Sequence, residues 1–196
     1  QVDADKAGVS VIGLGTGNLR PTITPNGAID AVDVSAANFT MANIIFAVPG
    51  TDAQTADINV DAAGCNLLGL VHRGSTGTEN KVSFITVTAN GDDLLIDGMR
   101  GFNDTVDMVS GIELAAASRV EISNTVILSA GSVGYSTGVI DDTGVCTDLS
   151  IHDCLFKNVK AAVAVVTFAS NSVGVCYDTY FSGRHTTIAS NVVTGS

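Results

Sequence analysis

The stretch LSIHDCLF, residues 149–156, decides the fold, because two of its apolar residues lie two positions apart and an aspartate follows them. This spacing is the period of a β-strand. The same apolar doublet recurs at steps of 26, 29, 26, 29 and 24 residues. The six doublets are Phe39/Met41, Cys65/Leu67, Leu94/Ile96, Val120/Ile122, Leu149/Ile151 and Val173/Val175. A repeat of about 27 residues predicts stacked units in a one-dimensional architecture.

Each repeat carries two further apolar segments, so we expect three short strands per unit. The upstream segments are Val32/Val34, Ile58/Val60, Ile85/Val87, Ile112/Leu114, Val139 and Val166/Phe168. The downstream segments are Ile44/Phe46, Leu70, Met99, Val126/Leu128, Leu155/Phe156 and Tyr180/Phe181. No window sustains the i, i+3, i+4, i+7 pattern of an amphipathic helix, which disfavours helical and leucine-rich solenoids.

The residues between the strands also repeat, and they favour tight turns. Small residues ending in a turn-tolerant one follow the upstream segments at Ser35–Asn38, Asp61–Gly64, Thr88–Gly91 and Ala115–Ser118. Two positions beyond the second doublet lie Asn43, Gly69, Gly98, Asn124 and Asp153, and Tyr177 breaks the rule in the sixth repeat. If the units stack in register, these amide and carboxylate side chains are expected to hydrogen-bond to the neighbouring unit.

Composition agrees with a β-rich chain that forms one domain over residues 1–196. Seventeen of the twenty acidic residues are Asp, Gly reaches 21, and the helix formers Glu and Lys are scarce. An apolar content of 45% is enough for a sizeable core. The net charge of −11 argues against a nucleic-acid partner, which needs clustered Lys and Arg. The most apolar stretch, residues 161–168, is too short to cross a membrane, so no membrane partner is expected.

Two segments carry a family resemblance. The runs VEISN at 120–124 and LSIHDCLF at 149–156 follow the rhythm I-x-I-x-[ND]-x-x-F of right-handed parallel β-helices of the pectate-lyase-like type, which the chain resembles. The resemblance implies an all-β, single-stranded right-handed parallel β-helix solenoid of about six coils, with three short strands in each coil of roughly 27 residues. The opening from Gly8 to Ile23 looks like a first coil. Residues 8–46, with GLGTGNLRPTIT and VSAANFTMANIIF, are similar to uncharacterised β-helix proteins of tailed bacteriophages and prophages.

Neither end of the chain supplies an obvious cap for the column. Residues 1–7 are polar and without periodicity, the chain does not begin with Met, and it stops within what looks like another coil. We therefore expect either a portion of a longer or processed polypeptide, or a column whose ends other subunits cover.

Cysteine and glycine patterns predict no cofactor or metal. The four cysteines, Cys65, Cys146, Cys154 and Cys176, contain no C-x-x-C unit and are expected to be free thiols. Cys146 and Cys154 would approach each other if they flank one coil corner. The run Gly13–Gly17 lacks the spacing and the following helix of a dinucleotide-binding loop, and is interpreted as a turn.

Acidic residues are the serious enzymatic candidates, because glycoside hydrolysis uses two nearby carboxyl groups. The candidates are Asp92/Asp93, Asp97, Asp104/Asp107 and Asp141/Asp142, with Arg100 and Arg119 as the nearest arginines. Asp also favours turns, and each candidate lies in an expected corner or loop, so no catalytic, cofactor-binding or metal-binding residue is assigned. The histidines suggest no triad: His72 takes the repeat position of Phe46, His152 points outward, and His185 follows Arg184 in a late loop.

Loops after the third strand vary in sequence and are expected on one side of the column, where solenoids present their contact surface. They cover residues 47–56, 73–83, 101–110, 129–137, 157–164 and 182–190. The apolar segment 161–166 fits either a buried strand or a subunit interface, and both interpretations stay open. Few aromatic residues remain for a sugar-binding groove, since the chain has no Trp and three Tyr.

The resemblance implies a structural component of a bacteriophage virion, either a head decoration or fibre protein or the shaft of a tail appendage. Its expected partners are copies of itself, in a homotrimer, and other virion proteins, with host surface polysaccharide left open. Its expected location is the virion, after synthesis in the host cytoplasm. The alternative is a polysaccharide-degrading tailspike or pectate-lyase-like enzyme, and a bacterial surface adhesin comes third.

Overall fold

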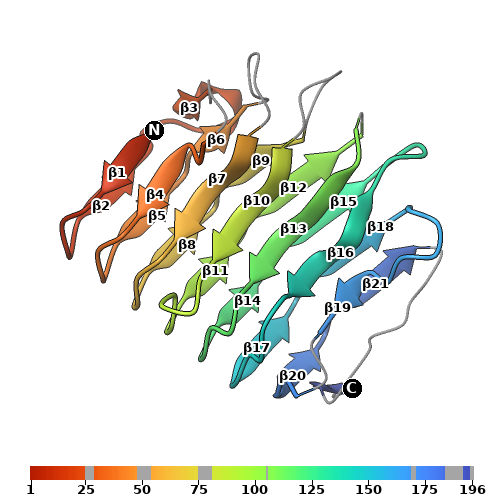
Figure 1. Cartoon of the computed structure of the whole chain (residues 1–196). Helices are drawn as coiled ribbons and strands as arrows, with labels where there is room; N and C mark the ends of the chain where they lie inside the picture. Colours follow the sequence, from red (N-terminus) through yellow and green to blue (C-terminus); the bar gives the residue numbers. More distant parts are fainter. Residues whose placement is uncertain are drawn as a thin grey trace.

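The structure is a computed structural model, and it describes residues 1–24, 29–47, 54–74, 81–104, 106–168, 171–183 and 192–194. Its strands form three parallel sheets that wind into a column (Figure 1). Sheet A contains β1 (Val2–Ala4), β4 (Val32–Val34), β7 (Gln54–Val60), β10 (Lys81–Val87), β13 (Met108–Leu114), β16 (Tyr135–Asp142) and β19 (Val166–Thr167).

Sheets B and C complete each coil. Sheet B contains β2 (Ser10–Ile12), β5 (Thr40–Ala42), β8 (Asn66–Leu68), β11 (Leu95–Asp97), β14 (Glu121–Ser123), β17 (Leu149–His152), β20 (Gly174–Tyr177) and β22 (Val192–Thr194). Sheet C contains β3 (Thr22–Ile23), β6 (Ile45–Phe46), β9 (Val71–Arg73), β12 (Arg100–Asn103), β15 (Val126–Ser129), β18 (Leu155–Asn158) and β21 (Tyr180–Gly183). The predicted parallel β-solenoid with three strands per coil is confirmed.

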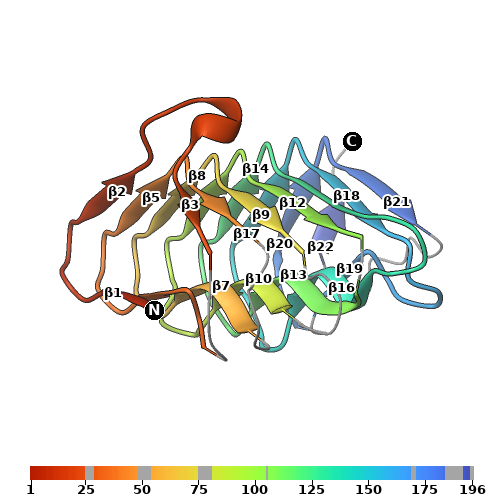
Figure 2. The ribbon, with the colours of Figure 1, turned by 90° about the horizontal axis from the view of Figure 1, so that it is seen from above.

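The opening segment forms a coil before the six repeats, as predicted, because β1, β2 and β3 pair with β4, β5 and β6. Between β2 and β3 the chain makes an excursion with one short 3-10 turn, Gly17–Leu19. Figure 2 shows this excursion in red, projecting from the column. Leu14 and Leu19 are each 83% exposed on it.

Equivalent apolar residues of successive coils stack in ladders that fill the column. Each buried Ile, Leu or Phe contributes roughly 1.5–3 kcal/mol. The ladder of sheet A is Val32, Ile58, Ile85, Ile112, Ile140 and Val166. The ladder of sheet B is Met41, Leu67, Ile96, Ile122, Ile151 and Cys176. The ladder of sheet C is Phe46, His72, Gly101, Ile127, Phe156 and Phe181.

Three predicted strand registers are wrong by one residue. Ile151 pairs with Cys176, so Val175 faces outward and is 45% exposed. In the fifth repeat Ile140, rather than Val139, continues the sheet A ladder. Both are buried, because alternation breaks at this place in β16, as it does in β7, β10 and β13, where consecutive residues are also buried. In sheet C the inward residue is Ile127, and the predicted doublet Val126/Leu128 lies on the outer face. In each segment apolar residues occur on both faces, so the pattern alone did not fix the register.

Left-handed residues turn each of two corners of the coil. Before the first inward residue of sheet B lie Asn38, Gly64, Asp93, Arg119 and Asp148, with φ between 55° and 72°. Two residues beyond the second inward residue lie Asn43, Gly69, Gly98, Asn124, Asp153 and Asp178, with φ between 46° and 67°. The rule that Tyr177 seemed to break therefore holds at Asp178. At the first corner the prediction is right for Asn38 and Gly64 but wrong for Gly91 and Ser118, because the connections from β10 to β11 and from β13 to β14 are longer and place the left-handed residue at Asp93 and Arg119.

Candidate functional site

Asp92 and Asp93 connect neighbouring coils. Asp93 accepts a hydrogen bond from Arg119 Nε at 2.5 Å, and Arg119 Nη2 lies 3.4 Å from Asp92 Oδ2. Asp92 also accepts the backbone N–H of Ser118 in the next coil at 2.8 Å. The hydrogen bond from Arg119 lowers the pKa of Asp93, so this carboxyl is ionised and lacks the proton that a general acid must donate. The two aspartates tie one corner of the column to the next.

Asp97 has the same kind of role on the outer face of sheet B. Its Oδ1 accepts hydrogen bonds from Ser123 Oγ at 2.9 Å and from Asn124 Nδ2 at 2.7 Å, both in the next coil. Asn43 makes the expected bond to the preceding coil, since its Nδ2 donates to the carbonyl of Gly13 at 2.7 Å. The predicted contacts between stacked coils are therefore present at these positions.

Asp107 and Asp142 are also engaged in neighbouring coils. Asp107 accepts the backbone N–H of Gly134 at 2.9 Å and pairs with Lys160. Burial raises the pKa of Asp107, but these contacts together lower it. Asp142 is buried and accepts a hydrogen bond from Ser172 Oγ at 2.5 Å. Asp107 lies in the expected loop, whereas Asp142 ends β16 in a buried position rather than in an exposed corner.

A carboxylate pair that sequence reasoning missed lies on the outer face of sheet A. Glu113 of β13 and Asp141 of β16 are directly opposite each other on adjacent parallel strands. Burial, and then the negative charge of Asp141, raise the pKa of Glu113. No basic side chain pairs with either residue within the part of the chain that the structure describes. Asp141 was a sequence candidate, but its register with Glu113 depends on the bulge in β16.

The strongest acid–base cluster lies inside the column. Asp57 Oδ2 is 2.7 Å from His72 Nδ1, Asp57 Oδ1 is 2.6 Å from Lys81 Nζ, and all three side chains are fully buried. Lys81 also donates to the carbonyl of Arg73 at 3.0 Å. Burial lowers the pKa of His72 despite the opposing effect of Asp57, so the ring is neutral at pH 7 and its Nδ1–H donates to the carboxylate.

This cluster resembles a catalytic dyad in chemistry, but its surroundings exclude a substrate. The His72 ring stacks on Phe46 at 4.9 Å with an interplanar angle of 3°, which confirms that His72 takes the repeat position of Phe46. Phe84 lies against the other side of the cluster, 5.4 Å from the His72 ring and 5.6 Å from Lys81 Nζ. His72 Nε2 has no hydrogen-bond partner among the described residues. Because the cluster of Asp57, His72 and Lys81 is buried against aromatic rings, its role is in packing and stability.

The other histidines bring no further catalytic group together. His152 lies on the outer face of sheet B, as predicted, with its Nδ1 2.9 Å from Asp153 and its Nε2 3.3 Å from Glu121. Its ring stacks on Tyr177 in the next coil at 4.9 Å. The hydrogen bond with Asp153 raises the pKa of His152. His185 and Arg184 lie outside the described residues.

All four cysteines are free and buried, as predicted. The thiol of Cys154 donates to the carbonyl of His152 at 3.0 Å, and the backbone N–H of Cys146 donates to Ser172 Oγ at 3.0 Å. Burial raises the pKa of Cys154 to about 11, so its thiol is protonated at neutral pH. Within the described ranges no three His, Cys, Asp or Glu side chains are placed to hold a metal ion.

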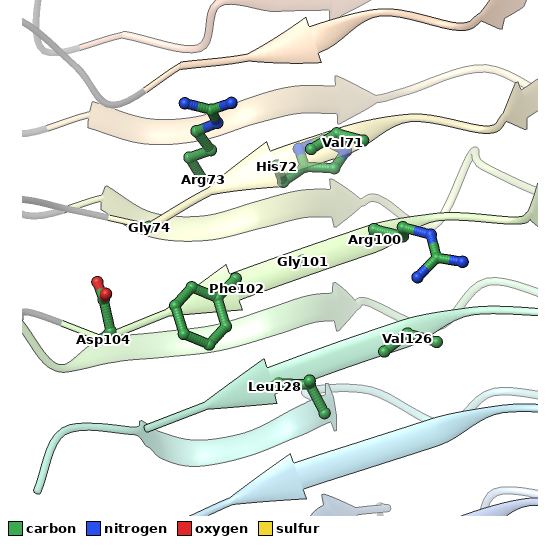
Figure 3. A pocket seen from close by; sticks show the side chains of 10 residues that line it. All are labelled: Val71, His72, Arg73, Gly74, Arg100, Gly101, Phe102, Asp104, Val126 and Leu128. Atoms are coloured by element: carbon green, nitrogen blue, oxygen red, sulfur yellow. The ribbon is translucent and has the colours of Figure 1, made fainter. Parts of the chain in front are cut away.

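A hollow lies on the outer face of sheet C. It has a volume of about 450 Å³. Its lining residues come from β9, β12, β15 and the segments that follow β9 and β12, and Figure 3 shows their side chains. They are Val71, His72, Arg73, Gly74, Arg100, Gly101, Phe102, Asp104, Val126 and Leu128. His72 contributes from within the strand, since its ring faces the core.

The hollow belongs to a longer surface, here called the basic–apolar face. It consists of the outward residues of sheet C: Val71, Arg73, Arg100, Phe102, Val126, Leu128, Leu155, Lys157 and Tyr180. Phe102 is 44% exposed and Tyr180 is 66% exposed. None of the ion pairs found among the described residues includes Arg73, Arg100 or Lys157. Val126, Leu128, Leu155 and Tyr180 were predicted as strand residues of the core, and Phe102 was placed in the expected loop 101–110, which is why sequence reasoning missed this face.

The sequence left open whether the segment 161–166 is a buried strand or a subunit interface. Val165 and Val166 are buried and Val166 begins β19, while Ala161 and Ala162 lie in an exposed turn. In the part of the chain that the structure covers, no helix has the length and apolar character needed to span a membrane.

Comparisons of the chain with protein-family models, with curated proteins and with solved structures found no significant match.

Proposed function

We propose that this chain is a structural β-helix that acts through protein–protein contact, as a component of a bacteriophage particle. The phage setting rests on the resemblance of residues 8–46 to β-helix proteins of tailed phages and prophages. The contact role rests on the surface chemistry of the column. One observation carries it: apolar residues and three basic residues that form no ion pair with another described residue gather on the outer face of sheet C in a chain of net charge −11. Such a face is typical of a protein interface.

The state of the acidic residues supports the same proposal. Asp92, Asp93, Asp97 and Asp107 hydrogen-bond to backbone or side-chain groups of neighbouring coils. A glycosidase needs one carboxyl group that stays protonated and a cleft that holds the sugar. Among the described residues Glu113 and Asp30 each combine a raised pKa with a carboxyl neighbour, Asp141 and Asp33 respectively, and neither lines the hollow on sheet C.

Two measurements test the proposal together. Antibodies against the purified chain should label intact particles of a phage that encodes it. The purified protein should leave acidic and capsular polysaccharides at their original length in size-exclusion chromatography. Shortening of a polysaccharide that is abolished by Glu113→Gln, with unchanged circular dichroism, would overturn the proposal in favour of an enzyme. Absence of the chain from purified particles would remove the phage assignment.

A further inference from the structure

The basic–apolar face has an unusual composition for this protein. The chain contains nine Lys and Arg in total, and three of them, Arg73, Arg100 and Lys157, project from sheet C. By contrast, Arg119 and Lys160 pair with aspartates of neighbouring coils. Positive charge that no described acidic residue pairs with, on a strongly acidic protein, favours an acidic partner.

The apolar part of this face favours a protein over a polysaccharide. Sugars stack on flat aromatic rings, whereas Val71, Val126, Leu128 and Leu155 present half-buried aliphatic side chains in adjacent coils. Phe102 lies among them in the hollow (Figure 3). An apolar centre with arginine and lysine around it is the usual composition of a protein–protein interface.

The chain itself carries a surface of the opposite charge, here called the acidic face. It runs along the outer side of sheet A in one row of paired residues, in which Asp141 is only 8% exposed and Glu113 is half-buried: Asp3, Asp33, Asn59, Thr86, Glu113, Asp141 and Thr167. Asn59 and Thr86 continue the row through hydrogen bonds at 2.9 and 3.0 Å. The repulsion between Glu113 and Asp141 is not offset by a basic residue in the described part of the chain.

Both faces carry charged residues on adjacent strands. Both run along the column and repeat with the strand separation of about 4.8 Å. Glu113 and Asp141 lie on adjacent strands of sheet A, and Arg73 and Arg100 lie on adjacent strands of sheet C. Arg73 is opposite Phe102 and Arg100 is opposite Val71, so the two arginines are offset by two residues along the strands. Their long side chains must therefore bend toward each other to meet Glu113 and Asp141, which are directly opposite.

We propose that the occupant of the basic–apolar face is a second copy of this chain, which docks through its acidic face. This inference rests on the proposed function, because it names the partner of the same contact surface. Each copy then uses two different surfaces, one as receptor and one as ligand, and every added copy relieves the charge repulsion on the acidic face of its neighbour.

Sedimentation velocity on charge-reversed variants tests the inference. The wild-type chain of 19.9 kDa should sediment as two or more copies at low salt, and the assembly should dissociate as salt rises. The variant Arg73→Glu/Arg100→Glu and the variant Glu113→Arg should each associate at least about 100-fold more weakly. An equimolar mixture of the two variants should associate again, because the altered faces are then complementary. Lys6→Glu, which lies outside both faces, is the control and should not change association. Circular dichroism shows whether each variant is folded.

Three outcomes would overturn the inference. The first is that the wild-type chain sediments as a monomer at about 100 μM and low salt, where an affinity in the micromolar range would give assembly. The second is that the mixture of the two variants fails to associate although both variants are folded. The third is that an anionic polysaccharide binds the wild-type chain but not the variant Arg73→Glu/Arg100→Glu, while the wild-type chain stays monomeric. A monomer that still labels phage particles, with labelling lost in Arg73→Glu/Arg100→Glu, would leave the proposed function standing and remove the second copy as partner.

Discussion

The buried ion pair of Asp57 with Lys81 gives the sharpest prediction for stability. Asp57→Ala removes the carboxylate that pairs with Lys81 and accepts the hydrogen bond of His72, both at 0% exposure. Breaking a buried pair by removing one partner costs about 3–5 kcal/mol, because the remaining charge stays in the core without its partner. The total stability of a domain is about 5–15 kcal/mol, so the loss is a large part of it.

Urea unfolding followed by circular dichroism measures this loss. With a slope of about 2.5 kcal/mol/M, the midpoint of Asp57→Ala should fall by about 1.5 M. Coincident transitions by circular dichroism and by tyrosine fluorescence check that unfolding is two-state. Asp5→Ala is the control, since Asp5 is exposed and pairs with Lys6, and its stability should change by less than about 0.5 kcal/mol.

A triple variant separates burial from ion pairing. Asp57→Leu/His72→Phe/Lys81→Met replaces the cluster by apolar side chains in a site already lined by Phe46 and Phe84. Such replacements are neutral or stabilise by about 1–4 kcal/mol. If Asp57→Ala loses less than about 1 kcal/mol while its circular dichroism is unchanged, the cluster is not buried as described and the reasoning fails.

Three further predictions concern pH, packing and turns. Burial lowers the pKa of His72 below its unfolded value of about 6.5, so the free energy of unfolding should fall as pH drops below about 6.5, by at most about 1.4 kcal/mol per pH unit, and should level off below the folded pKa. Urea midpoints at pH 5 to 8 check this. An equal dependence of the midpoint on pH in His72→Phe would contradict it. Gly101→Ala should cost about 1–3 kcal/mol, since an added Cβ would lie 2.6 Å from the Phe84 ring, and Gly101→Ala/Phe84→Leu should recover part of the loss in the same assay. Asp178 has φ 46°, so Asp178→Ala should cost about 1 kcal/mol while Asp178→Gly changes thermal stability little, and equal losses in both would argue against the left-handed turn.

Much of the fold was predictable from sequence because the column repeats one constraint. The doublets of repeats two to four, such as Leu94/Ile96, alternate cleanly between core and solvent and therefore fixed both strand and register. In the sixth repeat the outward residues Val173 and Val175 are themselves apolar, so a strand register shifted by one residue fitted the apolar pattern equally well. Asp178 shows that turn chemistry was the better guide there, since a left-handed residue marks the end of the strand.

The candidate sites were less predictable, because they depend on which residues of different coils meet. Asp92 and Asp93 were recognised as corner residues, but their contacts with Ser118 and Arg119 require the stacking offset. Asp57 and Lys81 gave no signal, since Asp57 is a polar residue next to the predicted doublet Ile58/Val60 and Lys81 was placed in the expected loop 73–83, whereas both are buried in the long strands β7 and β10. The outer face of sheet C was missed because Val126 and Leu128 looked like core.

Spin-label distances across coils test the central claim most directly. Thr40 and Ser150 occupy the same outward row of sheet B, four strand spacings apart, and Ser10 lies one spacing beyond Thr40. Labels on cysteines introduced at Thr40 and Ser150 should lie about 19 Å apart, and labels at Ser10 and Ser150 about 24 Å apart. The wild-type chain, with its buried thiols, should take up little label. Two distances that do not differ by about one strand spacing, or that both fall far from these values, would contradict the stacked column.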